Sequence, residues 1–444
     1  MNRPRLFRNG RLFDGVNFID HTDLRVDAAG KQIELGTGLP VRPEEEVVDL
    51  NQRWLIPGLV DCHVHFREPG LVRKEGYATG SLGALHGGVT TVLEIQNNPP
   101  LLTSAKLLQR KLQSLQGVSR VDYGCYGNLI EESLAELPAM APWTPAVKCF
   151  LGCSTGLSGI SDEGVIRRLF AAAAAAGLKI VAHCEDDGLM EQAKAQLKGE
   201  EARRHDLRRP RIAEVESIRQ ALRIANEVGA SLHVFHLSTA EGAGLVVGAA
   251  GRGQAATGTT APHYLLWDAE QAAKRPENRL KVNPSIKYQE DQQGLASMVA
   301  QGSLQGVGTD HAPHPMEEKA RVYEKAPSGF PSIDLLLPLT FAVHDRHSIA
   351  LESCLAAVTR LPADEFGLVD KGRLAPGADA DLVILDPTAK RQVEEKALPS
   401  KAKWSPYHGL RLRGFPEQVF LRGQRVFADC RALGPPRGRS LFGP

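Results

Sequence analysis

The chain has 444 residues, of which 42% are hydrophobic and 24% charged, and its formal net charge at pH 7 is +1. This length exceeds one average domain, and the composition is that of a globular protein with a large core. Without a block of like charges or an apolar run near the roughly 20 residues that span a bilayer, the sequence predicts neither a nucleic-acid partner nor a membrane partner.

The seven cysteines predict a cytoplasmic location. Their number is odd and no CxxC pair occurs, so neither a disulfide framework nor a zinc ribbon is indicated. Cys62, Cys149 and Cys184 stand in apolar runs, where a cysteine acts as a small buried hydrophobe. The first residues carry arginines but no apolar segment typical of a secretory signal, which also favours the cytoplasm.

Residues 1–56 and 374–444 share a pattern of short strands separated by polar turns. The expected strands cover residues 5–10, 24–27, 46–50, 380–386, 418–423 and 424–428. Each terminal piece alone is too short for a sound core. We therefore expect the two pieces to pair into one small β-sandwich beside the domain formed by residues 57–373.

The middle of the chain alternates apolar strands with helices, such as those expected at 162–176 and 214–228. Eight strands are expected, at residues 59–65, 89–95, 121–126, 146–151, 178–183, 232–237, 254–259 and 304–309. This order predicts an α/β fold, a TIM-like (β/α)8 barrel. A doubly wound open sheet is the alternative, although no GxGxxG follows a strand.

Ionisable side chains stand at or near the carboxyl ends of five of these strands. In a (β/α)8 barrel such ends gather at one mouth, where the catalytic groups lie. We therefore expect six side chains to converge on one site: His63, His65, Lys148, His183, His236 and Asp310.

His63 and His65 are the first candidate metal ligands. Residues two apart on a strand point to the same side, so both imidazoles can hold one cation. Alone, the pair would equally fit two buried, hydrogen-bonded histidines, but the matching groups on distant strands favour a metal site. Imidazole and carboxylate without thiolate suit Zn²⁺, with Mn²⁺, Co²⁺ or Fe²⁺ as alternatives.

Lys148 lies in the apolar run of residues 145–151. An ammonium group among metal ions would be repelled and poorly solvated. The side chain can lose its proton, or it can react with CO2 to form an anionic carbamate whose two oxygens could bridge two metal ions. We favour the bridging carbamate over a surface lysine.

The order HxH, Lys, His, His, Asp resembles that of the amidohydrolase superfamily over nearly the whole chain, from WLIPGLVDCHVH at 54–65 to KGRLAPGADADLVI at 371–384. Finer blocks are similar to those of dihydroorotases, within the cyclic amidase branch: HVHFREPG at 63–70, GGVTTV at 87–92, KVNP at 281–284 and TDHAPH at 309–314. The resemblance implies a hydrolase of small molecules that interconverts N-carbamoyl-L-aspartate and L-dihydroorotate in pyrimidine biosynthesis. It also implies a possible homodimer, since dimers are common in the family.

The resemblance further implies two divalent metal ions, with zinc favoured. His63 and His65 would bind the more buried ion, and His183 and His236 the second. Lys148, N-carboxylated, would bridge the two ions.

Asp310 would also bind the first ion and would act as the acid and base, exchanging a proton with a hydroxide that bridges the metals. The resemblance implies that Arg67, Asn97, Asn283 and His314 contact the substrate. An arginine suits a substrate carboxylate, because its planar fork of donors binds both oxygens.

The position of the substrate asparagine depends on how the motif is aligned. Counting from Gly87 assigns the role to Asn97, whereas counting back from Pro99 assigns it to Gln96. The upstream block matches the family better, so we favour Asn97.

Two other functions stay open at this point. One is an allantoinase or hydantoinase type of cyclic amidase, against which Arg67 argues, because hydantoins have no required carboxylate. The other is a metal-free, non-catalytic scaffold, against which the full set of expected ligands argues.

Three further features have less specific interpretations. The basic stretch 203–211 is expected to be a solvated loop. His311 is either a support for the neighbouring metal ligand or merely structural. The segment 317–328 either closes over the substrate or is a surface loop.

Overall fold

Seven parallel strands, adjacent in sequence order, form most of the wall of a barrel. The structure, a computed structural model, describes residues 3–154 and 159–443. The strands are β8 (Leu59–Val64), β9 (Val89–Ile95), β10 (Asp122–Asn128), β11 (Val147–Leu151), β12 (Ile180–Cys184), β13 (Leu232–Val234) and β14 (Ala256–Gly258). Every residue of β8 to β12 is buried, as expected for parallel strands covered on both faces.

The eighth expected strand, residues 304–309, is not a regular strand, and the prediction was wrong in that detail. The segment meets one edge of the sheet through a single bridge from Val307 to Thr260, and His311, two residues beyond the segment, meets the other edge through a single bridge to Val64. Glycine occupies two of the six expected positions, and glycine weakens a strand because it has no side chain to pack. The segment and His311 together still join the two edges, so the predicted barrel is confirmed.

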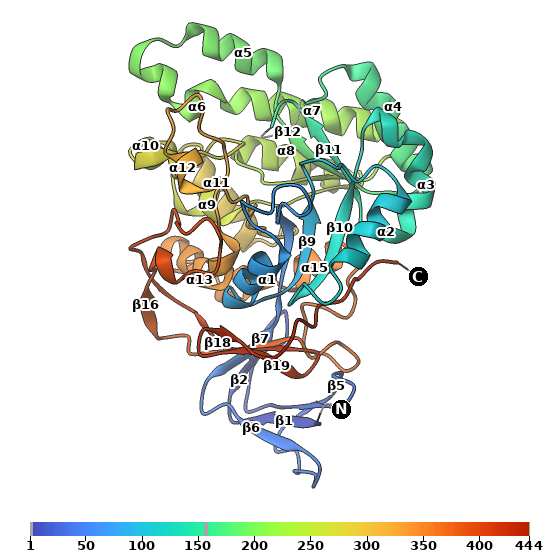
Figure 1. The fold of residues 1–444 in the computed structure, drawn as a ribbon, viewed down its shortest axis with the longest axis vertical. Helices are drawn as coiled ribbons and strands as arrows, with labels where there is room; N and C mark the ends of the chain where they lie inside the picture. Colours follow the sequence, from blue (N-terminus) through green and yellow to red (C-terminus); the bar gives the residue numbers. More distant parts are fainter. Residues whose placement is uncertain (1–2, 155–158, 444) are drawn as a thin grey trace.

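Helices return the chain between the strands and surround the barrel (Figure 1). The two helices predicted from periodicity are confirmed as α4 (Glu163–Ala175) and α7 (Arg211–Val228). The Asp162 carboxylate caps α4 by accepting a hydrogen bond of 2.8 Å from the Val165 amide. Gly229 ends α7 at φ 69°, a left-handed conformation that glycine adopts without a steric penalty.

The other helices that cover the barrel wall or its mouth are α1 (Tyr77–His86), α2 (Ala105–Ser114), α3 (Leu137–Met140), α5 (Asp187–Gln196), α6 (His205–Arg208), α8 (Ala240–Gly251), α9 (Pro262–Leu266), α10 (Ala269–Ala273), α11 (Gln289–Ala300), α12 (Met316–Lys319), α13 (Leu336–His347), α14 (Leu351–Ala356) and α15 (Arg360–Glu365). Within the described residues, none of the helices has both the length and the apolar character that a bilayer crossing requires.

Strands from both chain ends form two sheets that lie together below the barrel in Figure 1. The smaller sheet has the order β5 (Gln32–Gly36), β4 (Asp23–Val26), β1 (Arg5–Arg8), β6 (Glu46–Asp49). The larger has the order β20 (Arg431–Ala432), β19 (Gln424–Ala428), β18 (Pro416–Leu421), β15 (Leu382–Leu385), β7 (Trp54–Pro57), β2 (Arg11–Phe13), β3 (Phe18–Asp20). A separate small sheet pairs β16 (Lys390–Gln392) with β17 (Arg411–Arg413).

The two ends of the chain meet where β15 pairs antiparallel with β7, which places Leu382 opposite Pro57. A buried apolar cluster that includes Phe7, Leu24 and Phe420 draws on both sheets. The predicted sandwich built from both chain ends is therefore confirmed, whereas the domain boundaries expected near residues 56 and 374 stay a prediction.

A buried cluster of charges connects the sandwich to the barrel. The Nζ atom of Lys371 lies 2.5 Å from Asp122 of β10, 2.8 Å from Asp379 and 2.7 Å from Asp381, next to β15. All four side chains are at most 3% exposed. Burial lowers the pKa of Lys371, but the attraction of the three carboxylates is stronger and raises it overall. The lysine is therefore charged at neutral pH and holds the three carboxylates together.

We expect Lys371→Met to lower the free energy of unfolding by about 3–5 kcal/mol, because it removes the buried cation that contacts all three carboxylates. Urea denaturation followed by circular dichroism measures the effect. Lys31→Met is the matched control: Lys31 lies 2.8 Å from Asp379 but is 35% exposed, and such pairs contribute less than about 1 kcal/mol. Equal effects of the two substitutions would contradict the assigned role of Lys371.

Candidate active site

A cavity lies at the carboxyl ends of the barrel strands. Eight of the ten residues predicted for the site line it: His63, His65, Arg67, Asn97, Lys148, His236, Asn283 and Asp310. His183 stands behind His236, with 3.2 Å between their ring nitrogens, and His314 stands behind the lining beside Lys74. The structure therefore brings all ten predicted residues to one region.

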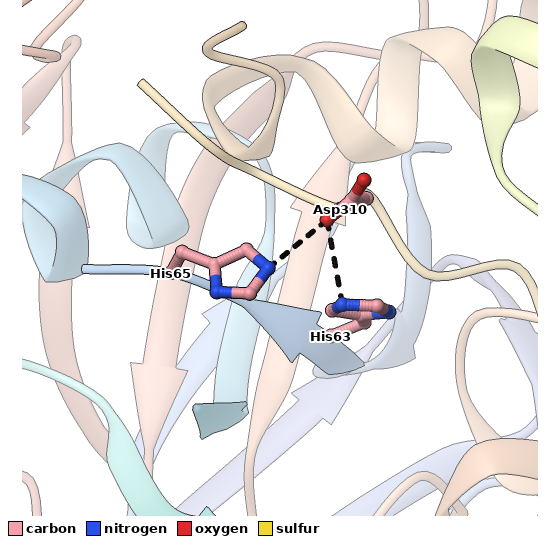
Figure 2. Close-up of side chains that lie close together, drawn as sticks. All are labelled: His63, His65 and Asp310. Atoms are coloured by element: carbon pink, nitrogen blue, oxygen red, sulfur yellow. Dashed lines mark ion pairs between the residues drawn. The ribbon is translucent and has the colours of Figure 1, made fainter. Parts of the chain in front are cut away.

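His63, His65 and Asp310 form the centre of this region, and Figure 2 shows both imidazoles directed at the carboxylate. The Nε2 atoms of His63 and His65 lie 3.3 Å and 3.2 Å from the same Oδ1 atom of Asp310. On the other side of its ring, His65 Nδ1 lies 2.8 Å from the Ile95 carbonyl oxygen, which can only accept a hydrogen bond. His65 Nδ1 therefore carries the proton of the neutral ring, and a lone pair on Nε2 faces the carboxylate.

A cation between these atoms would satisfy both lone pairs. Burial lowers the pKa of His65, which keeps the ring neutral, and burial together with the charge of Lys148 lowers the pKa of His63 strongly. The three ligand atoms lie within 4.8 Å of one another. Neutral imidazoles and a carboxylate at this spacing are a donor set that suits zinc.

His183 and His236 form the second pair. His183 Nε2 lies 3.0 Å from a carboxylate oxygen of Glu185, and Arg209 holds that carboxylate through two hydrogen bonds of 3.0 Å and 3.1 Å. Carboxylates in such positions orient metal-binding histidines. The other ring nitrogen of His183, Nδ1, faces His236 Nε2 at 3.2 Å, so these are the two nitrogens that could hold one ion.

Lys148 of β11 is 1% exposed, and its Nζ atom has no hydrogen-bond partner within the described residues. The atom lies 4.8 Å and 4.9 Å from the ring centres of Phe150 and Phe235. Burial lowers the pKa of Lys148 to about 7, against the opposing attraction of Asp310. The neutral amine, which is the form that reacts with CO2, is therefore abundant at neutral pH.

Three lining residues have left-handed backbone conformations: φ is 65° at Arg67, 42° at His236 and 48° at Asp310. Residues other than glycine seldom adopt this conformation, which costs about 1–3 kcal/mol each and is concentrated at functional sites. The surrounding packing therefore holds these three side chains in place at a cost in stability.

Arg67 is 4% exposed, and its Nη1 atom donates a hydrogen bond of 2.5 Å to Asn97 Oδ1. Burial lowers the pKa of Arg67 to about 10, so the guanidinium is still charged at neutral pH. Gln96, the alternative to Asn97, points elsewhere, since its Oε1 atom accepts from Lys111 at 3.0 Å. The structure thus places Asn97, and not Gln96, beside the buried guanidinium.

Asn283 and His314 lie on other sides of the cavity. The Oδ1 atom of Asn283 lies 3.0 Å from His205 Nε2. His314 Nδ1 accepts a hydrogen bond of 2.9 Å from the Lys74 ammonium, so in the neutral ring Nε2 carries the proton. Within the described residues this Nε2 atom has no hydrogen-bond partner, which leaves it as a donor for a bound molecule.

Several supporting residues were missed in the sequence. Asp61 joins His63 to the segment before Asp310, because its Oδ1 atom accepts from the amides of His63 at 3.2 Å and Thr309 at 3.1 Å. Burial raises the pKa of Asp61 to about 6. Glu185 had a visible signal, a carboxylate two residues after His183.

The expectation of a solvated loop at residues 203–211 was wrong. The segment contains α6, and it buries Asp206 and Arg209, which are 4% and 8% exposed.

For His311, the sequence left open a support for the neighbouring metal ligand or a structural role. Its Nδ1 atom accepts hydrogen bonds from the amides of Ser332 at 3.0 Å and Ile333 at 3.2 Å. His311 therefore anchors the chain after the site.

Comparisons with known proteins agree with this architecture. A family model for the amidohydrolase family matches residues 54–426. The dihydroorotase of Halobacterium salinarum is 33% identical over 435 residues, 95% of this chain and 96% of that protein. The dihydroorotase of Bacillus caldolyticus is 33% identical over 428 residues, 96% of this chain and 99% of that protein. Among solved structures, the L-hydantoinase (dihydropyrimidinase) of Arthrobacter aurescens has a TM-score of 0.91 at 26% identity and covers 99% of this chain and 100% of its own.

Proposed function

The chain belongs to the amidohydrolase family, and on this basis we propose that it is a dihydroorotase, which interconverts N-carbamoyl-L-aspartate and L-dihydroorotate. It is a hydrolase that acts on cyclic amides. The finer assignment, to a ring that carries a carboxylate, is supported by the chemistry of the cavity.

Arg67 is the observation that carries the proposal. Arg67 lines the cavity, its Nη1 atom donates to the neutral amide of Asn97, and its buried Nε atom has no hydrogen-bond partner within the described residues. A buried charge is costly when neutral groups alone contact it, and a carboxylate can accept two parallel hydrogen bonds from a guanidinium. L-dihydroorotate supplies a carboxylate on a small cyclic amide, whereas hydantoin and allantoin do not.

We assign the binding of two divalent metal ions to the two histidine pairs, with Asp310 completing the first set and carboxylated Lys148 shared by both. Zinc is the favoured metal because the donors are imidazoles and carboxylates. When bound, such an ion lowers the pKa of a water molecule from about 15.7 to about 7 and polarises a carbonyl oxygen. The buried Nζ atom of Lys148, which has no hydrogen-bond partner within the described residues, fits this occupancy.

Asp310 would carry the proton in the reaction. In ring opening its carboxylate accepts a proton from the attacking water and delivers it to the ring nitrogen that leaves. In ring closure the same oxygen takes the proton from the ureido nitrogen. Arg67, Asn97 and His314 would hold the carboxylate side of the substrate, with Arg67 supplying the positive charge.

The test is a substrate panel. Purified enzyme loaded with zinc is expected to open L-dihydroorotate with a kcat/KM well above those for allantoin and hydantoin. Arg67→Gln should lower kcat/KM for L-dihydroorotate by about 10- to 100-fold, the value of a hydrogen bond to a charged group, and should leave any hydantoin activity within about twofold. Arg73→Gln, whose side chain is 59% exposed, is the matched control. Preference of the wild-type enzyme for allantoin or hydantoin would overturn the proposal.

A hydantoinase activity is the second candidate, favoured by the TM-score of 0.91 with the Arthrobacter aurescens enzyme. The same panel separates it from the first, because a hydantoinase has no use for the charge of Arg67. An Arg67→Gln substitution that leaves the activity on each of the three substrates unchanged would favour the second candidate.

We also infer a place in pyrimidine biosynthesis and a cytoplasmic location. Five of the seven cysteines are buried, and within the described residues these five form no disulfide, which fits a reducing compartment. A homodimer is expected from the family resemblance, and size-exclusion chromatography with light scattering tests it.

A further inference from the structure

A chain of hydrogen bonds outside the metal ligands joins the segment 317–328 to Asn283 through His205. The Tyr323 hydroxyl contacts His205 Nδ1. On the opposite side of the ring, His205 Nε2 lies 2.9 Å from the Val282 carbonyl oxygen and 3.0 Å from Asn283 Oδ1. His205 belongs to α6, in the basic stretch that the sequence suggested was a solvated loop.

These contacts determine which ring nitrogen carries the proton. A backbone carbonyl can only accept, so Nε2 must be the donor in its bond to Val282. Burial and the positive charges of Arg209 and Lys281 lower the pKa of His205 well below its ordinary value, so the ring is neutral. Nδ1 is then an acceptor, and the Tyr323 hydroxyl donates to it.

The same logic orients the side-chain amide of Asn283. The Nε2–H group of His205 points at Asn283, and an NH2 group in that position would place two donors against each other. The carboxamide oxygen therefore faces His205, and the NH2 group takes the opposite side. Asn283 lines the catalytic cavity, so this orientation decides whether it offers the substrate a donor or an acceptor.

The position of Tyr323 is itself tied to the wall of the cavity. Lys281 Nζ donates to the carbonyl oxygens of Tyr323 at 2.6 Å and Ala326 at 2.7 Å. Ser328 and Gly329, just beyond, line the cavity. The segment 317–328 is thus fastened to the same strip of chain that carries Asn283.

We propose that His205, whose tautomer is set by the Val282 carbonyl and whose ring is held by the Tyr323 hydroxyl, is a positioning residue that holds the Asn283 amide so that its NH2 group donates to an oxygen of the bound substrate. We call the chain of hydrogen bonds from Tyr323 through His205 to Asn283 the relay. It rests on the proposed function for the identity of the substrate, but its geometry does not depend on which cyclic amide is bound. It also assigns a role to the segment 317–328: it supplies the hydroxyl that orders the relay.

A double-mutant cycle tests the relay. His205→Leu removes both ring nitrogens, and Asn283→Ala removes the amide. Each is expected to raise KM for L-dihydroorotate about five- to tenfold, with kcat changed less than threefold and metal content unchanged, because the lost bond holds the substrate and not the reacting atoms. The double variant should be no worse than Asn283→Ala alone, since residues that act through one another are not additive.

Two further variants separate positioning from a merely structural role. His205→Gln keeps a side-chain N–H that can donate to Asn283, and it should restore KM to within about twofold of wild type. Tyr323→Phe should raise KM two- to fivefold. Tyr288→Phe is its matched control, because it removes a hydroxyl that lies 3.3 Å from Asp206, in the same helix as His205, without touching the relay.

If the increases in KM caused by His205→Leu and Asn283→Ala multiply in the double variant, the proposal is overturned. It is also overturned if His205→Gln has a normal melting temperature but does not keep KM near that of wild type. If the wild-type enzyme does not open L-dihydroorotate but opens hydantoin or allantoin, the proposed function fails while the cycle, run on that substrate, still decides the relay. A protein that opens none of the three overturns both.

Discussion

Asp310→Asn is expected to lower kcat by about 10²- to 10⁴-fold, the contribution of a positioned acid and base, while the protein keeps its fold and most of its metal. Asparagine has nearly the same shape and still offers one oxygen toward His63 and His65, but its amide cannot take up a proton. Because a catalyst cannot change an equilibrium, kcat/KM should fall by the same factor for ring opening and for ring closure. Steady-state assays in both directions, with metal analysis of the same samples, measure this.

Glu318→Gln is the matched control for Asp310→Asn. Glu318 is a carboxylate near the cavity that lies 2.7 Å from the Lys74 ammonium, but it does not face the two histidines. Its loss should change kcat less than tenfold. Near-normal turnover by Asp310→Asn with metal bound would remove Asp310 from its assigned role.

Lys148→Ala is expected to lose metal and to lower activity at least a hundredfold, because it removes the group that we propose is shared by both ions. Short carboxylic acids such as acetate or propionate should restore part of the activity by entering the space left by the side chain. Protein prepared with ¹³C-labelled bicarbonate should show a carbamate carbon by NMR in the wild type and not in the variant.

Lys179→Ala is the control for Lys148→Ala. Lys179 immediately precedes β12 and pairs with Glu365 at 2.6 Å. The substitution therefore removes a lysine from the barrel without changing the cavity. Neither its metal content nor its response to carboxylic acids should differ from wild type. An active, metal-replete Lys148→Ala variant would show that the bridge does not depend on this lysine.

Much of the architecture could be predicted because its signals are local. A buried parallel strand appears in the sequence as an apolar run, and the residue at its end is visible there. The positions of His63, Lys148 and His183 on such runs therefore predicted that they meet at one mouth of the barrel. Caps such as Asp162 are equally local. The irregular pairing of residues 304–309 could not be predicted from the sequence. The single bridges at Val307 and His311 depend on how the barrel closes.

The supporting contacts could not be predicted, because each joins residues far apart in the chain. Arg209 reaches Glu185 from a stretch whose composition suggested solvent exposure, and only the fold shows that the guanidinium is buried. Lys371 meets Asp122 across the boundary between sandwich and barrel. The tautomer of His205 depends on the position of the Val282 carbonyl, which no periodicity encodes.

The pairing of β7 with β15 has a consequence for synthesis of the protein. One strand is complete before the barrel begins, and its partner leaves the ribosome only after the barrel has been made. At about 5–20 residues per second, β7 waits on the order of tens of seconds with one edge unpaired. Unpaired edges invite association with other chains, so a nascent chain is most vulnerable during this interval. The sandwich therefore closes only after the barrel has been synthesised, although it includes strands made before the barrel.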